Sequence, residues 1–241
     1  MLLQTPFPAP AGPSSPAPTL SLPADDLVVD LSVYAPQSDS YLLVEAIRGL
    51  GDRVAGSRVL DLCCGTGIAA VTAARRRAAE VLALDLNPAA VRSAAANAAR
   101  HAPAMHARRG CLTDAIEHGP FDVVVCNPPY VPAPREDVDH ASAESAWDAG
   151  RDGRSVLDPL CCRLPDLLVP GGVALLVHSE VAGIDATVQA CRDAGLSSEV
   201  LSRTRIPLGP VMLDRRDWLV ARGLLPPGAD TEELAVIRAS L

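Results

Sequence analysis

The chain has 241 residues, 49% of them hydrophobic, and a formal net charge of −8. This length suits one domain with an ample core, and no apolar run is long enough to span a bilayer. The acidic balance and an aromatic content of 3% argue against a tight, nonspecific grip on a nucleic-acid backbone.

The seven cysteines show no CxxC spacing, and the first ten residues, MLLQTPFPAP, lack the basic and apolar regions of a signal peptide. We therefore expect free thiols in a reducing cytoplasm, and neither a disulfide framework nor a zinc site. His101, His106 and His118 have no metal-ligand spacing with acids or cysteines. We expect them on the surface and predict no metal centre.

In the first half of the chain, a tail rich in Pro, Ala and Ser over residues 1–24 precedes alternating strands and helices. We predict strands over residues 27–34, 58–62, 80–84, 105–109 and 121–126, and helices over residues 41–50, 68–77 and 88–100. Asp39 or Ser40 is the expected N-cap of the first helix. Asn87, followed by Pro88, is the expected cap of the third.

In the second half, a polar loop over residues 131–145 is long enough to be a lid that faces the substrate. The elements expected after it are a helix over 155–168, a turn at Gly171-Gly172, a strand over 173–178, a helix over 184–194, strands over 196–202 and 217–221, and a helix over 231–241. Residues 206–213 are expected to extend the last strand as a hairpin. The alternation predicts one doubly wound α/β sheet with helices on both faces over residues 25–225, followed by a short C-terminal segment over 226–241.

A glycine turn joins the strand that ends near Asp61 to the next helix, through the sequence Cys63-Cys64-Gly65-Thr66-Gly67. Such a turn lets the backbone approach a ligand, and the helix N-terminus favours ligand acceptors. The spacing of Gly65, Gly67 and Ala70 also fits the dinucleotide fingerprint, so NAD stays open as an alternative. Asp61 argues against NAD, because its carboxylate would repel a pyrophosphate. It would pair with an ammonium group, such as that of S-adenosylmethionine (SAM).

Two further segments complete the expected nucleotide site. Asp85 ends the second strand of this unit, where a carboxylate accepts both ribose hydroxyls of a nucleotide. The segment Gly110 to Asp114 follows the next strand and is expected to be a loop that borders the adenine.

The strand pattern Phe121 to Cys126 runs directly into Asn127-Pro128-Pro129-Tyr130. Uninterrupted β-branched residues suit a strand that is covered on both faces, and the C-terminal ends of such strands face the ligand crevice. The prolines hold the backbone extended and donate no N–H. The side-chain oxygen of Asn127 and the carbonyl of Pro128, beside the ring of Tyr130, therefore form a predicted clamp for a planar NH2 group.

With these motifs at these separations, the chain resembles a class I SAM-dependent methyltransferase. More narrowly, it resembles the HemK/PrmC family of protein-glutamine N5-methyltransferases, whose members modify the glutamine of a GGQ tripeptide in release factors. Residues 33–40, with the sequence VYAPQSDS, and the pair Ala146-Trp147 resemble the short, eukaryotic and archaeal-type branch. The resemblance covers about residues 27–221 and implies a mostly parallel, seven-stranded, Rossmann-like sheet.

The same resemblance implies the residues of the site. Those expected to hold SAM are Ser40, Asp61, Cys63, Gly65, Gly67, Asp85, Cys111, Leu112 and Asn127, and those expected to clamp the substrate are Asn127, Pro128 and Tyr130. Cys63 replaces the first glycine of the SAM loop. Cys111 stands where an acid commonly meets the adenine amine, so either its backbone or Asp114 makes that contact.

The expected function is methylation of the side-chain amide of a protein glutamine, with a release factor among the candidate partners. The N-terminal helical domain of the bacterial release-factor enzymes is not evident, which puts their usual substrate in doubt. Three alternatives stay open at this point: methylation of an exocyclic base amine in RNA or DNA, methylation of a small-molecule amide or amine, and SAM binding without catalysis.

Overall fold

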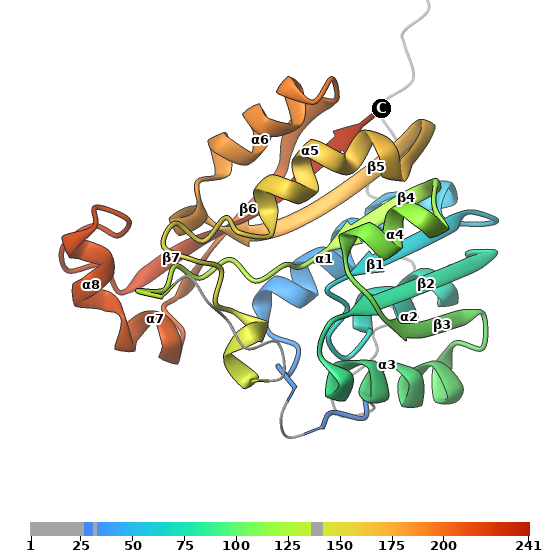
Figure 1. The fold of residues 1–241 in the computed structure, drawn as a ribbon, viewed down its shortest axis with the longest axis horizontal. Coiled ribbons are helices and arrows are strands. Elements are labelled where there is room, and N and C mark those ends of the chain that lie inside the picture. Colours follow the sequence, from blue (N-terminus) through green and yellow to red (C-terminus); the bar gives the residue numbers. More distant parts are fainter. Residues whose placement is uncertain (1–26, 31–32, 136–141) are drawn as a thin grey trace, which may run out of the picture.

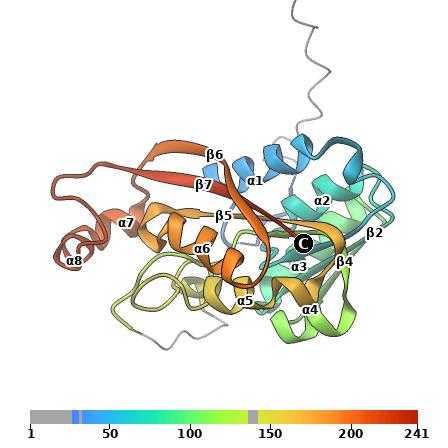
Figure 2. The same ribbon diagram turned by 90° about the horizontal axis from the view of Figure 1, so that it is seen from above.

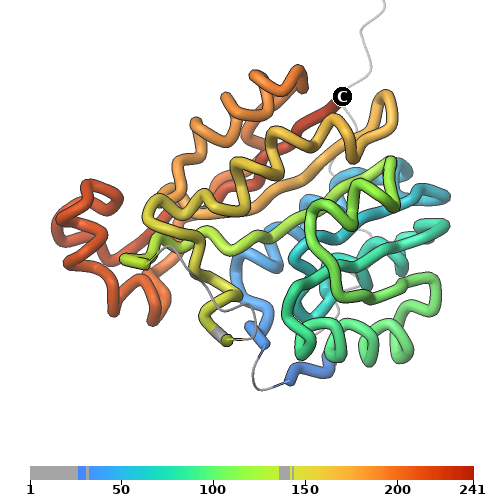
Figure 3. Tube along the Cα trace, viewed as in Figure 1, coloured from blue at the N-terminus to red at the C-terminus, as the bar shows by residue number. Residues whose placement is uncertain are grey.

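The computed structural model describes residues 27–30, 33–135 and 142–241. Seven strands form one sheet in the order β3-β2-β1-β4-β5-β7-β6 (Figures 1 and 3). They are β1 (Arg58–Leu62), β2 (Glu80–Asp85), β3 (Met105–Arg109), β4 (Phe121–Cys126), β5 (Leu168–Ser179), β6 (Ser197–Pro207) and β7 (Thr231–Ser240). Neighbours among β1 to β5 are parallel, whereas β7 is antiparallel to both β5 and β6. The predicted doubly wound, mostly parallel, seven-stranded sheet is confirmed.

Helices cover both faces of this sheet, as the view in Figure 2 shows. One face carries α1 (Ser38–Gly49), α2 (Ile68–Arg75) and α3 (Pro88–His101), and the other carries α4 (Leu112–His118), α5 (Leu157–Leu167) and α6 (Ile184–Asp193). Two buried apolar clusters, one on each face, fill the space between the helices and the strands. No helix among the described residues is both long enough and apolar enough to cross a membrane.

The register of the three central strands positions the site. Leu62 at the end of β1 pairs with Leu84 of β2 on one side and with Cys126 of β4 on the other. The residues that follow these positions are Cys63, Asp85 and Asn127, so they leave the sheet at the same edge. Parallel strands bring their carboxyl ends together in this way, which is why ligands bind there in open α/β sheets.

At the N-terminus, two predictions are corrected. Residues 27–30 and 33–34 form no strand, and the backbone N–H and C=O of Val28 instead bond to the side chain of buried Asn97 on α3, at 2.7 and 2.9 Å. Helix α1 begins at Ser38 with Gln37 as its N-cap, so Asp39 and Ser40 lie inside its first turn. The predicted tail over residues 1–24 lies outside the described residues, as do residues 136–141 of the predicted lid.

At the C-terminus, the predicted strand over residues 217–221 and the hairpin over 206–213 are wrong. Beyond β6, these residues form two short helices, α7 (Pro210–Asp214) and α8 (Arg216–Ala221), at one end of the sheet (Figure 1). The predicted helix over residues 231–241 is also wrong, since this segment is β7, inserted between β5 and β6. The turn predicted at Gly171-Gly172 lies within β5, where Leu241 bonds to both glycines.

Because β7 lies inside the sheet, its buried side chains should contribute strongly to stability. Ile237 is fully buried, whereas its neighbour Arg238 is exposed and pairs with exposed Glu199. We expect Ile237→Ala to lower the free energy of unfolding by about 2–5 kcal/mol and Arg238→Ala to lower it by less than about 1 kcal/mol. Denaturant unfolding of both variants measures this difference, and similar small losses would contradict the central place of β7.

Candidate active site

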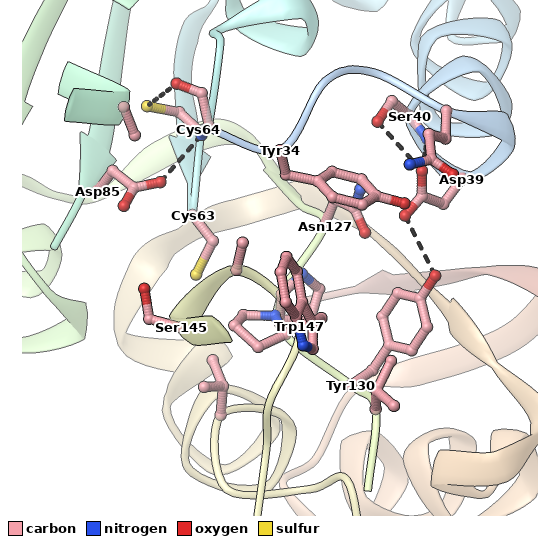
Figure 4. A pocket seen from close by; sticks show the side chains of 18 of the residues that line it. Tyr34, Asp39, Ser40, Cys63, Cys64, Asp85, Asn127, Tyr130, Ser145 and Trp147 are labelled. Carbon is pink, nitrogen blue, oxygen red and sulfur yellow. Dashed lines mark hydrogen bonds between the residues drawn. The ribbon is translucent and has the colours of Figure 1, made fainter. Parts of the chain in front are cut away.

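A cavity of about 820 Å³ opens at the edge of the sheet where β1, β2 and β4 end. This volume lies in the range of small-molecule sites, roughly 300–1,000 Å³. Every residue predicted for the site except Gly67 lines the cavity: Ser40, Asp61, Cys63, Gly65, Asp85, Cys111, Leu112, Asn127, Pro128 and Tyr130. Segments far apart in the sequence therefore meet in one hollow, part of which Figure 4 shows.

The turn between β1 and α2 is held by backbone bonds. Cys64 donates its N–H to the carbonyl of Leu84 at 3.0 Å, and Gly67 donates to the carbonyl of Cys64 at 2.7 Å. Gly67 has a φ of +79°, and a Cβ there would lie 2.7 Å from the Cε of Met105. Gly67 thus shapes the turn without lining the cavity. Cys63, which replaces a glycine, takes a φ of +60°, a conformation that a side chain makes costly.

Asp61 is buried at the end of β1, and its Oδ2 accepts the N–H of Ala70 in α2 at 2.9 Å. Burial raises the pKa of Asp61 to about 7, and the nearby carboxylate of Asp85 adds to this rise. No arginine in the described part of the chain pairs with Asp61. The cavity wall therefore holds an acidic group that would be stabilised as a carboxylate by a cationic ligand.

Asp85 joins two turns at the end of β2. Its Oδ2 accepts the N–H of Gly65 at 2.9 Å, and its Oδ1 accepts the N–H of Asn87 at 2.8 Å. Burial raises the pKa of Asp85. Each carboxylate oxygen has a further lone pair, so the side chain can still accept from a ligand while it organises the loop.

The segment Gly110 to Asp114 is only partly a loop, because α4 begins at Leu112 with Cys111 as its N-cap. The carboxylate of Asp114 accepts the N–H of Cys111 at 2.7 Å, which lowers the pKa of Asp114. Asp114 is therefore occupied in capping the helix and does not line the cavity, whereas Cys111 and Leu112 do. Of the two expected adenine contacts, the structure brings Cys111 to the cavity.

Asn127 follows the last residue of β4, and its Oδ1 is buried with no hydrogen-bond partner among the described residues. The hydroxyl of Tyr130 donates to Oδ2 of Asp39 at 3.1 Å, which ties the ring of Tyr130 to the first turn of α1 (Figure 4). Oδ1 of Asp39 accepts the backbone N–H of Ser40 at 2.6 Å. Burial, together with the nearby carboxylate of Asp39, raises the pKa of Tyr34, which also lines the cavity. The clamp thus has an unpaired acceptor at Asn127 and an anchored aromatic wall.

A second segment packs against the clamp. The N–H of Val131 donates to the carbonyl of Trp147 at 2.8 Å, and the N–H of Ala149 donates to the carbonyl of Val131 at 3.1 Å. Between them, the buried carboxylate of Asp148 pairs with Arg135 at 2.9 Å and with Arg215 at 2.6 Å. These contacts fix Trp147, which lines the cavity, relative to Asn127 and Tyr130 (Figure 4).

The described residues offer no other obvious chemistry. They contain no group of three or more His, Cys, Asp or Glu side chains that could hold a metal ion. His106 and His118 are exposed, as predicted, and His101 is half-buried. All seven cysteines are free.

Comparison with known proteins identifies the family. A family model described as the methyltransferase small domain matches residues 35–147. A putative protein N5-glutamine methyltransferase of Methanocaldococcus jannaschii is 32% identical over 181 residues, which cover 75% of this chain and 89% of the relative. The chain belongs to the HemK family of methyltransferases.

Further relatives agree with this membership. The mouse methyltransferase HEMK2 is 30% identical over 198 residues, and the aligned region covers 72% of this chain and 88% of the mouse protein. A release factor glutamine methyltransferase of Deinococcus radiodurans is 37% identical over 187 residues, which cover 72% of this HemK-family chain. This chain spans only 64% of the length of that bacterial relative.

Solved structures share the fold of this HemK-family protein. The structure of the E. cuniculi Mtq2–Trm112 complex matches with a TM-score of 0.59 and 24% identity, over 87% of this chain and 99% of that chain. The T. Thermophilus 16S rRNA methyltransferase RsmC, in complex with AdoMet and guanosine, matches with a TM-score of 0.56 and 21% identity. The match covers 85% of this chain and 43% of that chain.

Several cavity residues of this HemK-family methyltransferase escaped prediction. Asp39 was expected only as a helix cap, yet it anchors Tyr130. Trp147 was noted only for its resemblance to one branch of the family. Glu232 of β7 also lines the cavity, but it lay in a predicted terminal helix, which gave no reason to place it near the site.

Proposed function

We propose that this protein transfers a methyl group from SAM to the side-chain amide nitrogen of a protein glutamine. The observation that carries the proposal is the buried Oδ1 of Asn127, which faces a ligand-sized cavity at the end of β4 without a partner. A buried acceptor with no partner costs about 1–3 kcal/mol, so an acceptor retained here is best explained by a ligand that donates to it.

The lining of the cavity fits SAM. Asp61 suits the ammonium group of the cofactor, because a cation would stabilise its buried carboxylate, and Asp85 has free lone pairs for ribose hydroxyls. The residues that we assign to SAM are Ser40, Asp61, Cys63, Gly65, Asp85, Cys111, Leu112 and Asn127, with Gly67 shaping the turn. When bound, SAM supplies an electrophilic methyl group on a sulfonium centre.

The residues of the chain would act by positioning the acceptor. An amide nitrogen is a poor nucleophile because its lone pair is delocalised into the carbonyl group. If Asn127 Oδ1 and the Pro128 carbonyl each accept one N–H, they orient the nitrogen towards the methyl group and favour its pyramidal form. The same two oxygens stabilise the positive charge that develops on the nitrogen. The alkylated amide is strongly acidic and loses its proton to water, so the chain needs no dedicated base.

The relatives support a protein acceptor. The Deinococcus radiodurans relative is a release factor glutamine methyltransferase, and the Mtq2–Trm112 complex is described as responsible for the methylation of the eRF1 translation termination factor. We propose that this chain likewise modifies an exposed glutamine of a release factor. The seven free cysteines suit the reducing cytoplasm, where translation factors work.

The clamp predicts the behaviour of Asn127→Ala. The variant loses one of the two acceptors that position the amide, so we expect its turnover to fall by at least about 100-fold. SAM affinity should stay within about twofold of wild type, because the other cofactor contacts remain. Mass spectrometry of a GGQ peptide measures the gain of one methyl group, and calorimetry measures SAM binding. Near-normal turnover of the variant would refute the clamp.

The pKa of Asp61 predicts a pH dependence of SAM binding. The carboxylate forms as the pH rises through about 7, and only the carboxylate pairs with an ammonium group. Wild-type affinity should therefore be about tenfold higher at about pH 8 than at about pH 6. Asp61→Asn keeps an oxygen for Ala70 but no charge, so its weaker affinity should not change over this range. A wild-type affinity that falls as the pH rises, or stays constant, would rule out this role.

A further inference from the structure

Three residues that line the cavity hold a buried polar atom with no hydrogen-bond partner and form no ion pair in the described part of the chain. The atoms are Oδ1 of Asn127, Nε1 of Trp147 and Oε2 of Glu232. Asn127 and Glu232 present acceptors, whereas the indole of Trp147 presents a donor. The proposed function uses the acceptor of Asn127 and leaves the donor of Trp147 without a role.

Trp147 is held firmly beside the clamp. Its carbonyl accepts the N–H of Val131, which directly follows Tyr130, and the next residue, Asp148, is buried between two arginines. Trp147 and Tyr130 pack against the same apolar cluster, and both line one cavity with Asn127 (Figure 4). These contacts hold in place the backbone from which the indole projects into the wall of the cavity.

The hydrogen-bonding groups of a carboxamide match this arrangement. A carboxamide has two N–H donors and one carbonyl oxygen. If Asn127 and the Pro128 carbonyl accept the two N–H groups, the carbonyl oxygen of the substrate still needs a donor. An indole N–H can only donate, and Trp147 places a buried, unpaired one in the wall of the same cavity.

We propose that Trp147 is a substrate-binding residue whose indole N–H donates a hydrogen bond to the carbonyl oxygen of the acceptor amide. This proposal rests on the proposed function and adds a basis for specificity. A primary amine carries no such acceptor and would leave the buried N–H unpaired, so the site selects a carboxamide over an amine. Selectivity of this kind, in which the wrong substrate leaves a buried polar group unpaired, is characteristic of sites that hydrogen-bond their substrate.

Two peptides that differ only at the acceptor test this proposal. One carries glutamine and the other carries ornithine, which has the same side-chain length but a methylene in place of the carbonyl group. Their dissociation constants are measured with wild-type protein and with Trp147→Phe, in the presence of S-adenosylhomocysteine. We expect the variant to bind the glutamine peptide about tenfold more weakly and the ornithine peptide less than twofold more weakly.

A second variant keeps the shape of the ring. The chain has two tryptophans, so in a Trp218→Phe background all remaining tryptophan can be replaced biosynthetically by benzothienylalanine, which has sulfur in place of the N–H. Trp218→Phe alone is the matched control, because Trp218 does not line the cavity. The sulfur analogue should reproduce the selective loss for glutamine, while the control should bind both peptides like wild type.

The outcomes separate the two proposals. Equal losses for both peptides, or no loss for glutamine in the sulfur analogue, would overturn the role of Trp147 while wild-type protein still methylates the glutamine peptide. A wild-type protein that binds SAM but neither binds nor methylates any glutamine peptide would overturn the proposed function itself, and the role of Trp147 with it.

Discussion

The parallel pairing of β1 with β4 is the interaction on which the rest of the structure depends. Because Leu62 pairs with Cys126, the turn after β1 and the Asn127 segment after β4 leave the sheet side by side. The chain thereby brings a glycine turn, which suits a nucleotide, next to a pair of acceptors, which suits an amide. A slip of two residues in this register would move Asn127 by about 6.5 Å along the strand and separate the two halves of the site.

The first half of the fold could be predicted because its signals are local. Short apolar runs, glycine turns and the Asn87-Pro88 cap mark each βα unit, and the strands pair mainly with close neighbours in sequence. The chain beyond β6 lacks such signals, whereas β5, α6 and β6 lie close to their predicted ranges. The short apolar run within Thr231–Ser240 does not by itself distinguish a buried helix from a buried strand, and only its insertion between β5 and β6 makes it a strand. Tertiary pairing of this kind overrides local preference.

The residues of the candidate site also fall into those that the sequence could predict and those that it could not. Asp61 and Asp85 lie at the carboxyl ends of β1 and β2, so their arrival at the cavity follows from the fold. Asp39, Trp147 and Glu232 reach the cavity through contacts between distant segments, including the bond from Tyr130 to Asp39, 91 residues apart in sequence. A single sequence contains no local pattern for such contacts. The assignment of the adenine contact depended on detail of the same kind, since only the structure shows that Asp114 caps α4.

The central claim is that two oxygens after β4 hold the NH2 group of a glutamine side chain. The most direct measurement is a crystal structure of the protein with S-adenosylhomocysteine and a glutamine peptide. The account predicts that the amide nitrogen lies within hydrogen-bonding distance of both Asn127 Oδ1 and the Pro128 carbonyl, in line with the sulfur of the cofactor product. A glutamine bound elsewhere, or an Asn127 side chain turned away from the amide, would contradict it.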